Sequence, residues 1–171
     1  KGIHTVAVSA GYVTEAARAE VFASYDAVNI DLKAFTEGFY QVRAGGHLQP
    51  VLDTLVWLAT QDIWVEITTL LIPGLNDSSD EVRQLAAWVF QHMGPDVPLH
   101  FSAFHPDYKL QDVARTPLDT LQRARAIALD EGLHHVYTGN VHDPAGDTTT
   151  CKKCGTPVIE RDWYTLEAWR L

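Results

Sequence analysis

The spacing of strand-like runs constrains the fold of this chain more than any other feature of its sequence. Short runs rich in Val, Ile, Leu and Thr begin near residues 4, 27, 64, 98 and 135. Between them lie longer segments whose apolar residues recur at helical spacing. Parallel strands need helical crossovers of this length, so the rhythm predicts βα units around a parallel sheet. The expected strands cover residues 4–10, 27–32, 64–72, 98–104 and 135–139.

Helices are expected over residues 14–25 and 50–60, and two more have clear start signals. Ser78 and Glu81 stand at capping-box spacing before the third helix. For the fourth helix, Thr116 is the expected N-cap and Pro117 the first helical residue. Gly132 is a natural stop for that helix.

Two architectures fit this alternation of strands and helices. An open, doubly wound sheet of five strands would be complete at this length, whereas a (β/α) barrel needs about eight units in ~250 residues. The start Lys1-Gly2-Ile3 is typical of a helix C-terminus with a C-cap glycine, so we expect a helix before residue 1. The sequence therefore predicts an α/β fold, the C-terminal part of a (β/α) partial TIM-type barrel with parallel strands (residues 1–140), plus a short CxxC-containing tail (141–171).

Composition excludes several classes of function. The net charge of −9 argues against a nucleic-acid partner, because neutralising phosphates requires clustered Lys and Arg. Apolar runs fall short of the roughly 18 residues of a membrane span, so no membrane partner is expected. Both cysteines lie in one CxxC motif, which is not the disulfide framework of a secreted domain. We therefore expect a cytoplasmic protein.

Polar residues gather where the expected strands end, the edge at which parallel α/β folds bind ligands. In the segment AVNIDLK, strand alternation places Asn29, Asp31 and Lys33 on one face and the apolar residues on the other. Asp31 and Lys33 could be a simple ion pair, Glu66 a solvated residue, and His105 an ordinary loop histidine. Their common position favours a polar ligand with both charge signs. The candidate residues are Ser9, Gly11, Asp31, Lys33, Glu66, Thr68 and His105.

Other catalytic motifs are missing from the sequence. The segment from Pro73 to Asn76 lacks the Lys and Ser/Thr of a P-loop, and no GxGxxG or GxSxG pattern occurs. A convincing Ser/His/Asp set is also absent, so covalent hydrolysis is unsupported.

The tail contains Cys151-Lys152-Lys153-Cys154-Gly155, the pattern of a zinc-knuckle half-site. A structural zinc needs four ligands, and the chain has two cysteines. His142 and Asp143 could contribute, but ligands upstream of residue 1 are the preferred interpretation. A redox pair or a non-functional pair are the alternatives.

Several blocks fall in the order of one known family. They are SAGYVTEAA, VNIDLKAFTEGFY, VEITTLLIPGLNDS, LHFSAFHPDYKL and the ending YTGNV…TTTCKKCGTPVIERDWY. Over nearly all 171 residues the sequence resembles the radical SAM enzymes of the AmmeMemoRadiSam system, relatives of pyruvate formate-lyase activating enzymes. The resemblance implies a partial (β/α)6 barrel. The family's CxxxCxxC cluster loop and GGE segment do not occur in this sequence.

The resemblance implies that S-adenosylmethionine is the cofactor and that a [4Fe–4S] cluster is held by ligands upstream of Lys1. Asp31 and Lys33 match the DLK element beside the cofactor, and His105 matches the histidine of the FHP segment. Ser9 and Gly11 match a Ser/Thr-Asn-Gly segment beside the nucleoside, with Ala10 in place of the usual Asn. Glu66 and Thr68 would lie on the adenine side. Cys151 and Cys154 match a tail pair whose partners in the family would be N-terminal cysteines, and zinc is the candidate metal.

The implied activity is reductive cleavage of S-adenosylmethionine to a 5′-deoxyadenosyl radical that abstracts hydrogen from a substrate. The electron donor would be a flavodoxin or ferredoxin, and the substrate a glycyl-radical protein, another protein or a small molecule. Without cluster ligands, the 171 residues are expected to be inactive alone. Two other readings stay open: a partner-docking α/β module with a zinc-knuckle tail, and a complete small acid–base enzyme using Asp31, Lys33 and His105.

Overall fold

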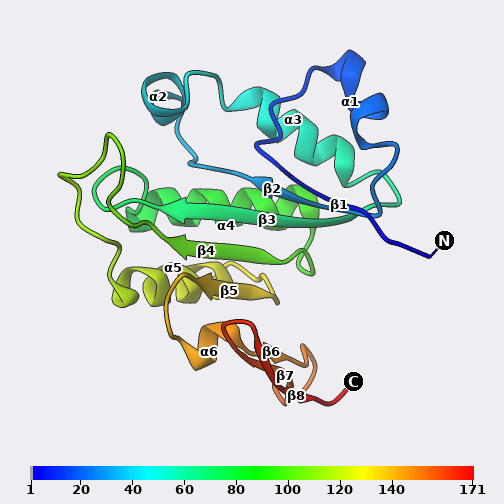
Figure 1. Cartoon of the computed structure of the whole chain (residues 1–171), viewed down its shortest axis with the longest axis vertical. Coiled ribbons are helices and arrows are strands. Elements are labelled where there is room, and N and C mark those ends of the chain that lie inside the picture. Colours follow the sequence, from blue (N-terminus) through cyan, green and yellow to red (C-terminus); the bar gives the residue numbers. More distant parts are fainter. Residues whose placement is uncertain (1) are drawn as a thin grey trace.

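A five-stranded parallel sheet organises the molecule, in a computed structural model that describes residues 2–171 (Figure 1). The strands pair in chain order, β1-β2-β3-β4-β5, and every pair is parallel. They are β1 (Val6–Ser9), β2 (Ala27–Asp31), β3 (Trp64–Leu71), β4 (Leu99–Ala103) and β5 (Val136–Gly139). A doubly wound sheet would reverse its strand order at a switch point. Because this order never reverses, the barrel-type prediction is confirmed.

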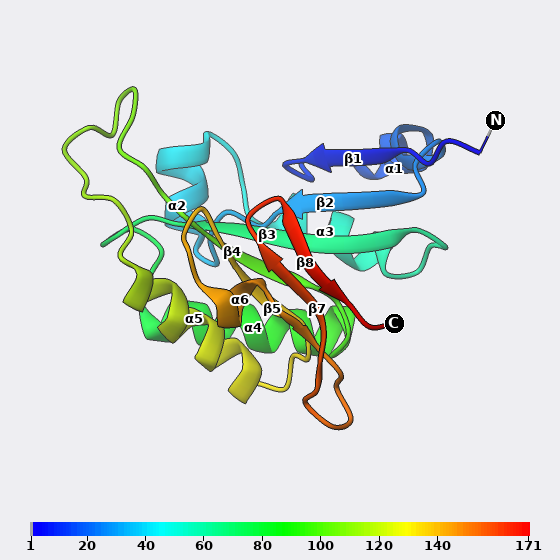
Figure 2. The ribbon, with the colours of Figure 1, turned by 60° about the horizontal axis from the view of Figure 1, so that its bottom comes forward.

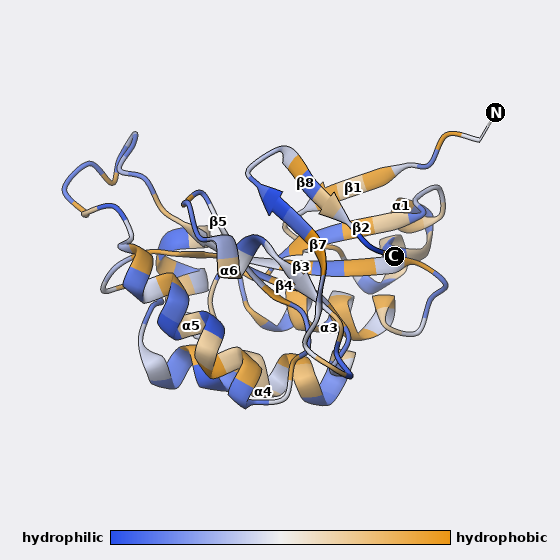
Figure 3. Cartoon of the chain, turned by 90° about the horizontal axis from the view of Figure 1, so that it is seen from below, coloured by the Kyte–Doolittle hydropathy of each residue, from blue (hydrophilic) through white to orange (hydrophobic). Residues whose placement is uncertain are grey.

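Helical segments connect all four pairs of successive strands. Helix α1 (Glu15–Phe22) follows β1, and the short α2 (Glu37–Phe39), the π-helical turn η1 (Tyr40–Ala44) and α3 (Gln49–Leu58) follow β2. Helix α4 (Ser79–Met93) follows β3, and α5 (Leu118–Asp130) follows β4. Right-handed crossovers between strands in sequential order place their helices on the same side of a sheet. Figure 3 shows α3, α4 and α5 together on one side of it.

The tail forms a separate small sheet on the other side. After α6 (Pro144–Asp147), strands β6 (Thr149–Thr150), β7 (Pro157–Asp162) and β8 (Thr165–Trp169) pair antiparallel in the order β6-β7-β8. In Figures 2 and 3 strands β7 and β8 lie across the face of the large sheet that the helices leave uncovered. The division of the chain at residue 140 stays a prediction.

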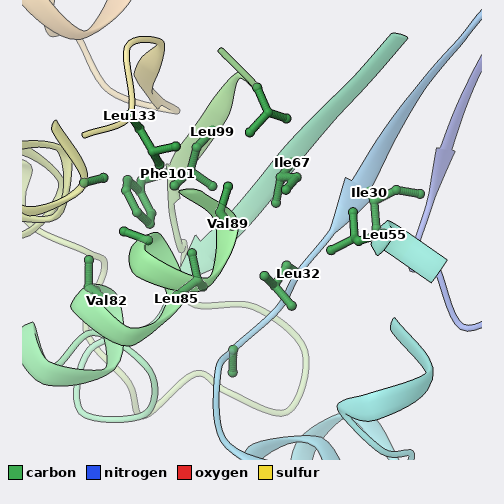
Figure 4. Close-up of a cluster of buried hydrophobic side chains, with 14 of the residues drawn as sticks. Ile30, Leu32, Leu55, Ile67, Val82, Leu85, Val89, Leu99, Phe101 and Leu133 are labelled. Carbon is green, nitrogen blue, oxygen red and sulfur yellow. The ribbon is translucent and has the colours of Figure 1, made fainter. Parts of the chain in front are cut away.

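The core lies between the sheet and its helices (Figure 4). Burial alternates along β2 and β4, so Ile30, Leu99 and Phe101 are fully buried while their neighbours are half-exposed. Helices α3 and α4 contribute Leu55 and Leu85 to the same cluster. Burying one such side chain stabilises the fold by about 1.5–3 kcal/mol. The helix-facing side of the sheet therefore supplies stability, and the other side is available for polar groups.

Helix starts differ from the prediction in two details. Ser78 caps α4 by accepting a hydrogen bond from the amide of Glu81 at 3.2 Å. The Glu81 carboxylate does not close the box but accepts from the amide of Phe35 at 2.7 Å, in the loop after β2. In α5 the N-cap is Pro117, one residue later than expected. Thr116 is buried and instead donates to the carbonyl of Leu71 at 2.6 Å, because the loop before α5 lies against β3.

The predicted C-cap conformation of Gly2 is present as a positive φ of 67°. Lys1, the other residue of that prediction, lies outside the described residues. Among residues 2–171, no helix combines the length and apolar character needed to cross a membrane.

Candidate functional site

The face of the sheet opposite the helices, here called the open face, is lined with polar side chains. Strand register places them in rows, because paired residues of parallel strands share a face. Asn29 of β2 pairs with Glu66 of β3 in one row. The next row toward the carboxyl ends contains Asp31, Thr68, His100 and Tyr137, one from each of β2 to β5.

Asp31 and Lys33 form an ion pair at the carboxyl end of β2. Nζ of Lys33 donates to Oδ2 of Asp31 at 2.9 Å, and both side chains are half-exposed. The backbone of Lys33 is held on two sides: its amide donates to the hydroxyl of Tyr40 at 3.1 Å, and its carbonyl accepts from Asn76 at 2.7 Å. Burial raises the pKa of Tyr40 to about 12, so this hydroxyl stays protonated. A rigid backbone thus presents a paired acid and base to solvent.

Ser9 and Gly11 shape the turn after β1. The Ser9 hydroxyl accepts a hydrogen bond from the Gly11 amide at 3.1 Å. Gly11 is buried, has a φ of 65°, and would place a Cβ only 2.8 Å from Cγ2 of Ile30. The turn therefore requires glycine. Ser9 pairs in register with Ile30, so its side chain leaves β1 on the face opposite to Asp31.

Glu66 belongs to a network that leads toward the tail rather than toward Asp31. Its carboxylate accepts from Nε1 of Trp64 at 3.0 Å and lies 2.8 Å from Nε2 of His100. The hydrogen bond with His100 lowers the pKa of Glu66. The His100 ring stacks on Tyr137 with centroids 5.1 Å apart, and the hydroxyl of Tyr137 lies 2.9 Å from that of Thr149 in β6.

A cavity of about 410 Å³ opens beside this network, between the sheet and the tail. Arg161 of β7 lines it and donates to the hydroxyl of Thr149 at 3.1 Å. The network therefore ties the tail to the open face.

The remaining predicted residues lie at the same edge but in different settings. Thr68 donates to Oδ1 of Asn29 at 2.9 Å, next to Asp31 in its row. His105 is exposed, two residues after the end of β4. The structure thus brings Asp31, Lys33 and Thr68 together, with His105 in a loop at the same end of the sheet. Glu66 lies one row toward the amino ends.

Cys151 and Cys154 sit in the turn between β6 and β7. The Gly155 amide donates to the carbonyl of Cys151 at 2.8 Å, and Gly155 has a φ of 70°. Sγ of Cys154 lies 3.3 Å from the Thr156 hydroxyl, and this contact lowers the pKa of the thiol. Within residues 2–171 no three His, Cys, Asp or Glu side chains are close enough to hold a metal ion together. The predicted half-site therefore gains no third ligand from this part of the chain.

Sequence reasoning missed His100, Tyr137 and Arg161. The signal for the first two was available, because His100 alternates with buried Leu99 and Phe101, as Asp31 does with Ile30 and Leu32. Arg161 has no such signal, since its position depends on how the tail folds back.

Comparisons with known proteins identify relatives in sequence and in fold. No family model matches the sequence. The chain is 41% identical over 160 residues to "Uncharacterized protein MJ0808" of Methanocaldococcus jannaschii; the match covers 94% of the chain and 47% of that protein. The chain thus spans about half the length of this curated relative.

Two solved structures share the fold. A domain of pyruvate-formate lyase-activating enzyme from Bacteroides vulgatus superposes with a TM-score of 0.70 at 20% identity, over 81% of this chain and 83% of that one. TYW1 with a lysine-pyruvate adduct bound superposes with a TM-score of 0.54 at 22% identity, over 75% and 41%. The predicted α/β class and partial-barrel architecture are confirmed by these likenesses.

Proposed function

We propose that this chain supplies the S-adenosylmethionine-binding part of a radical SAM enzyme, similar to pyruvate formate-lyase activating enzymes, that removes a hydrogen atom from its substrate. The observation that carries the proposal is the Asp31–Lys33 pair on the open face at the carboxyl end of β2. The fold shared with a domain of pyruvate-formate lyase-activating enzyme and the quoted sequence blocks support it.

The charges at this edge suit the proposed cofactor. S-adenosylmethionine carries a sulfonium, an ammonium and a carboxylate, so its site needs both charge signs. Asp31 has its Oδ1 without a hydrogen bond among the described residues, and it can face a positive group. Lys33 keeps two further N–H donors for a carboxylate or hydroxyl oxygen. Charge-assisted hydrogen bonds of this kind are short and orient a ligand strongly.

The other predicted contacts complete the site as a proposal. Thr68 and His105 would add polar contacts at the same edge, and the Ser9–Gly11 turn would border the nucleoside. Glu66 would act from one row deeper, where His100 and Trp64 keep its carboxylate ionised and fixed. When bound, the cofactor supplies the chemistry of hydrogen-atom abstraction, while these residues orient it and shield its charges.

The iron–sulfur cluster of this proposal does not fit the described residues. A [4Fe–4S] cluster is held by several cysteine thiolates, and this chain has two, both on the tail turn. We therefore assign the cluster to residues outside the 171. The electron donor, a flavodoxin or ferredoxin, and the cytoplasmic location are parts of the same proposal.

Calorimetric titration of the 171-residue chain with S-adenosylmethionine tests the site. Asp31→Asn and Lys33→Met should each weaken binding about 10- to 100-fold, because each removes one charge-assisted contact. Asp62→Asn, an exposed acid in the turn before β3, is the matched control and should bind as the unchanged chain does. Equal affinity of all variants would contradict the proposed site.

A second measurement tests the assignment of the cluster. The chain is reconstituted anaerobically with iron and sulfide and studied by EPR. No [4Fe–4S] signal that shifts with S-adenosylmethionine is expected, and no turnover. Such a signal would show that the chain holds the cluster itself.

A further inference from the structure

A cavity of about 310 Å³ lies away from the open face, where α1 and α3 begin side by side. Tyr12, Thr14, Glu15 and Arg18 line it from the β1–α1 segment, and Pro50 and Asp53 from α3. Its volume is at the small end of the range of about 300–1,000 Å³ found for ligand sites. The proposed cofactor site uses none of these residues.

Arg18 is the unusual member of the cavity wall. Only 8% of the residue is exposed, and its one hydrogen bond runs from Nε to the hydroxyl of Thr54 at 3.2 Å. Its Nη2 forms an ion pair with Oδ2 of Asp53 at 4.0 Å, a separation too long for a hydrogen bond. Arginine has five N–H donors, and a buried charge is costly unless its donors are matched. Within residues 2–171, every fully enclosed side-chain N or O atom has a hydrogen-bond partner. The Nη donors of Arg18 that lack a partner are therefore not fully enclosed, and the cavity that Arg18 lines gives a ligand access to them.

The first turn of α1 adds further donors. Thr14 has the extended conformation of an N-cap, but its hydroxyl makes no capping hydrogen bond. Within residues 2–171, the amides of Glu15 and Ala16 make no hydrogen bond. A helix N-terminus also carries a partial positive charge. Arg18 and this turn together form a pocket for a carboxylate, since guanidinium forks match carboxylates.

Two carboxylates oppose these donors. Oδ1 of Asp53 accepts from Nε2 of Gln49 at 2.7 Å, while Oδ2 has no hydrogen bond and faces the Arg18 side. Glu15 is the first residue of α1. A simple anion bound at Arg18 would be repelled by these acids, and a simple cation would be repelled by Arg18. A ligand that joins a carboxylate to an ammonium group can bind the donors at Arg18 through its carboxylate and the acids through its ammonium group.

We propose that this cavity binds a free α-amino acid. Its carboxylate would take the Nη donors of Arg18 and the amides at the start of α1, and its ammonium group the free oxygen of Asp53. The ring of Tyr12, which lies against the backbone at Gly46, and the ring of Pro50 leave apolar room for a small side chain.

Calorimetric titration of the 171-residue chain with the standard amino acids tests the proposal, at concentrations up to about 10 mM. The best binder is then compared with its N-acetyl derivative, which lacks the ammonium group, and its amide, which lacks the carboxylate. Each derivative should bind about tenfold more weakly or worse. No binding by any amino acid, or equal binding of either derivative, would overturn the proposal.

Variants assign the binding to the cavity. Asp53→Asn, at a half-exposed side chain, should weaken amino-acid binding about tenfold. The same variant should bind the N-acetyl derivative as well as the unchanged chain or better, because one carboxylate that repels an anion is gone. Arg18→Lys should weaken binding as well, and thermal unfolding checks that it still folds. Glu20→Gln, exposed on the same helix, and Asp31→Asn, on the open face, are controls that should bind normally. Normal binding by Asp53→Asn, or loss of binding in either control, would contradict the site.

Discussion

Nε2 of His100 lies 2.8 Å from Oε2 of Glu66, and this contact joins two strands on the open face. The same histidine stacks on Tyr137, whose hydroxyl contacts Thr149 of the tail. A pair of half-exposed side chains thus connects the large sheet to the tail sheet. Its contribution to stability is modest because solvent screens the charges.

The Glu66–His100 pair makes stability depend on pH in a defined direction. The folded-state pKa of Glu66 is lowered from 4.5, mainly by His100, so its contribution is present above pH 4.5 and lost as pH falls through the folded pKa. Urea unfolding measures the coupling free energy between Glu66 and His100. It compares the unchanged chain with Glu66→Gln, His100→Gln and the double variant. We expect about 0.5 kcal/mol at pH 6 and a smaller value at pH 3.5. A coupling that grows as the pH falls would contradict this assignment.

The two faces of the sheet should respond differently to the same substitution. Leu99 is fully buried in the core on the helix-facing side of the sheet, so Leu99→Ala should lower the free energy of unfolding by about 2–5 kcal/mol. Leu70, on the open face of β3, is 39% exposed, and Leu70→Ala should cost less than about 1 kcal/mol. Urea unfolding measures both. Equal losses would mean that the open face is covered to the same degree as the core.

Alanine substitutions at Gly11 and Gly45 can distinguish the cost of backbone strain from the cost of a steric clash. Both have positive φ, 65° and 69°, but only at Gly11 does an added Cβ meet another side chain, Ile30 at 2.8 Å. Gly45→Ala should cost about 1 kcal/mol from strain alone. Gly11→Ala should cost about 1–3 kcal/mol more because the core would be overpacked. Ile30→Ala removes the clashing Cγ2, so the double variant Gly11→Ala/Ile30→Ala should lose less stability than the two single losses added together, as thermal unfolding can show. Simple additivity of the two losses would place the clash elsewhere.

The sheet could be predicted from sequence because the residues of each strand either alternate between apolar and polar or form an apolar run, with turn signals at both ends. Gly132 ends its helix as expected. The site was only partly predictable. Strand alternation correctly placed Asp31 and Lys33 on one face, but register separated Glu66 from them and gave it His100 as a partner. Register depends on pairing between distant strands, which a local pattern does not contain. Glu81 shows the same limit. Its spacing from Ser78 predicted a capping box within one helix, whereas in the structure its carboxylate accepts a hydrogen bond from the distant amide of Phe35.

Cys154 should be the more reactive thiol of the tail pair. It is exposed, whereas Cys151 is partly covered, and the Thr156 contact lowers its pKa and so raises its thiolate fraction. Labelling with iodoacetamide at pH 7, with a chelator present to strip any metal, should modify Cys154 about two- to fivefold faster than Cys151. Mass spectrometry of peptides reads both rates. Thr156→Val removes the hydroxyl contact and should slow Cys154, while Thr165→Val in β8 should not. Faster labelling of Cys151, or no effect of Thr156→Val, would show that this hydroxyl does not set the reactivity of the pair.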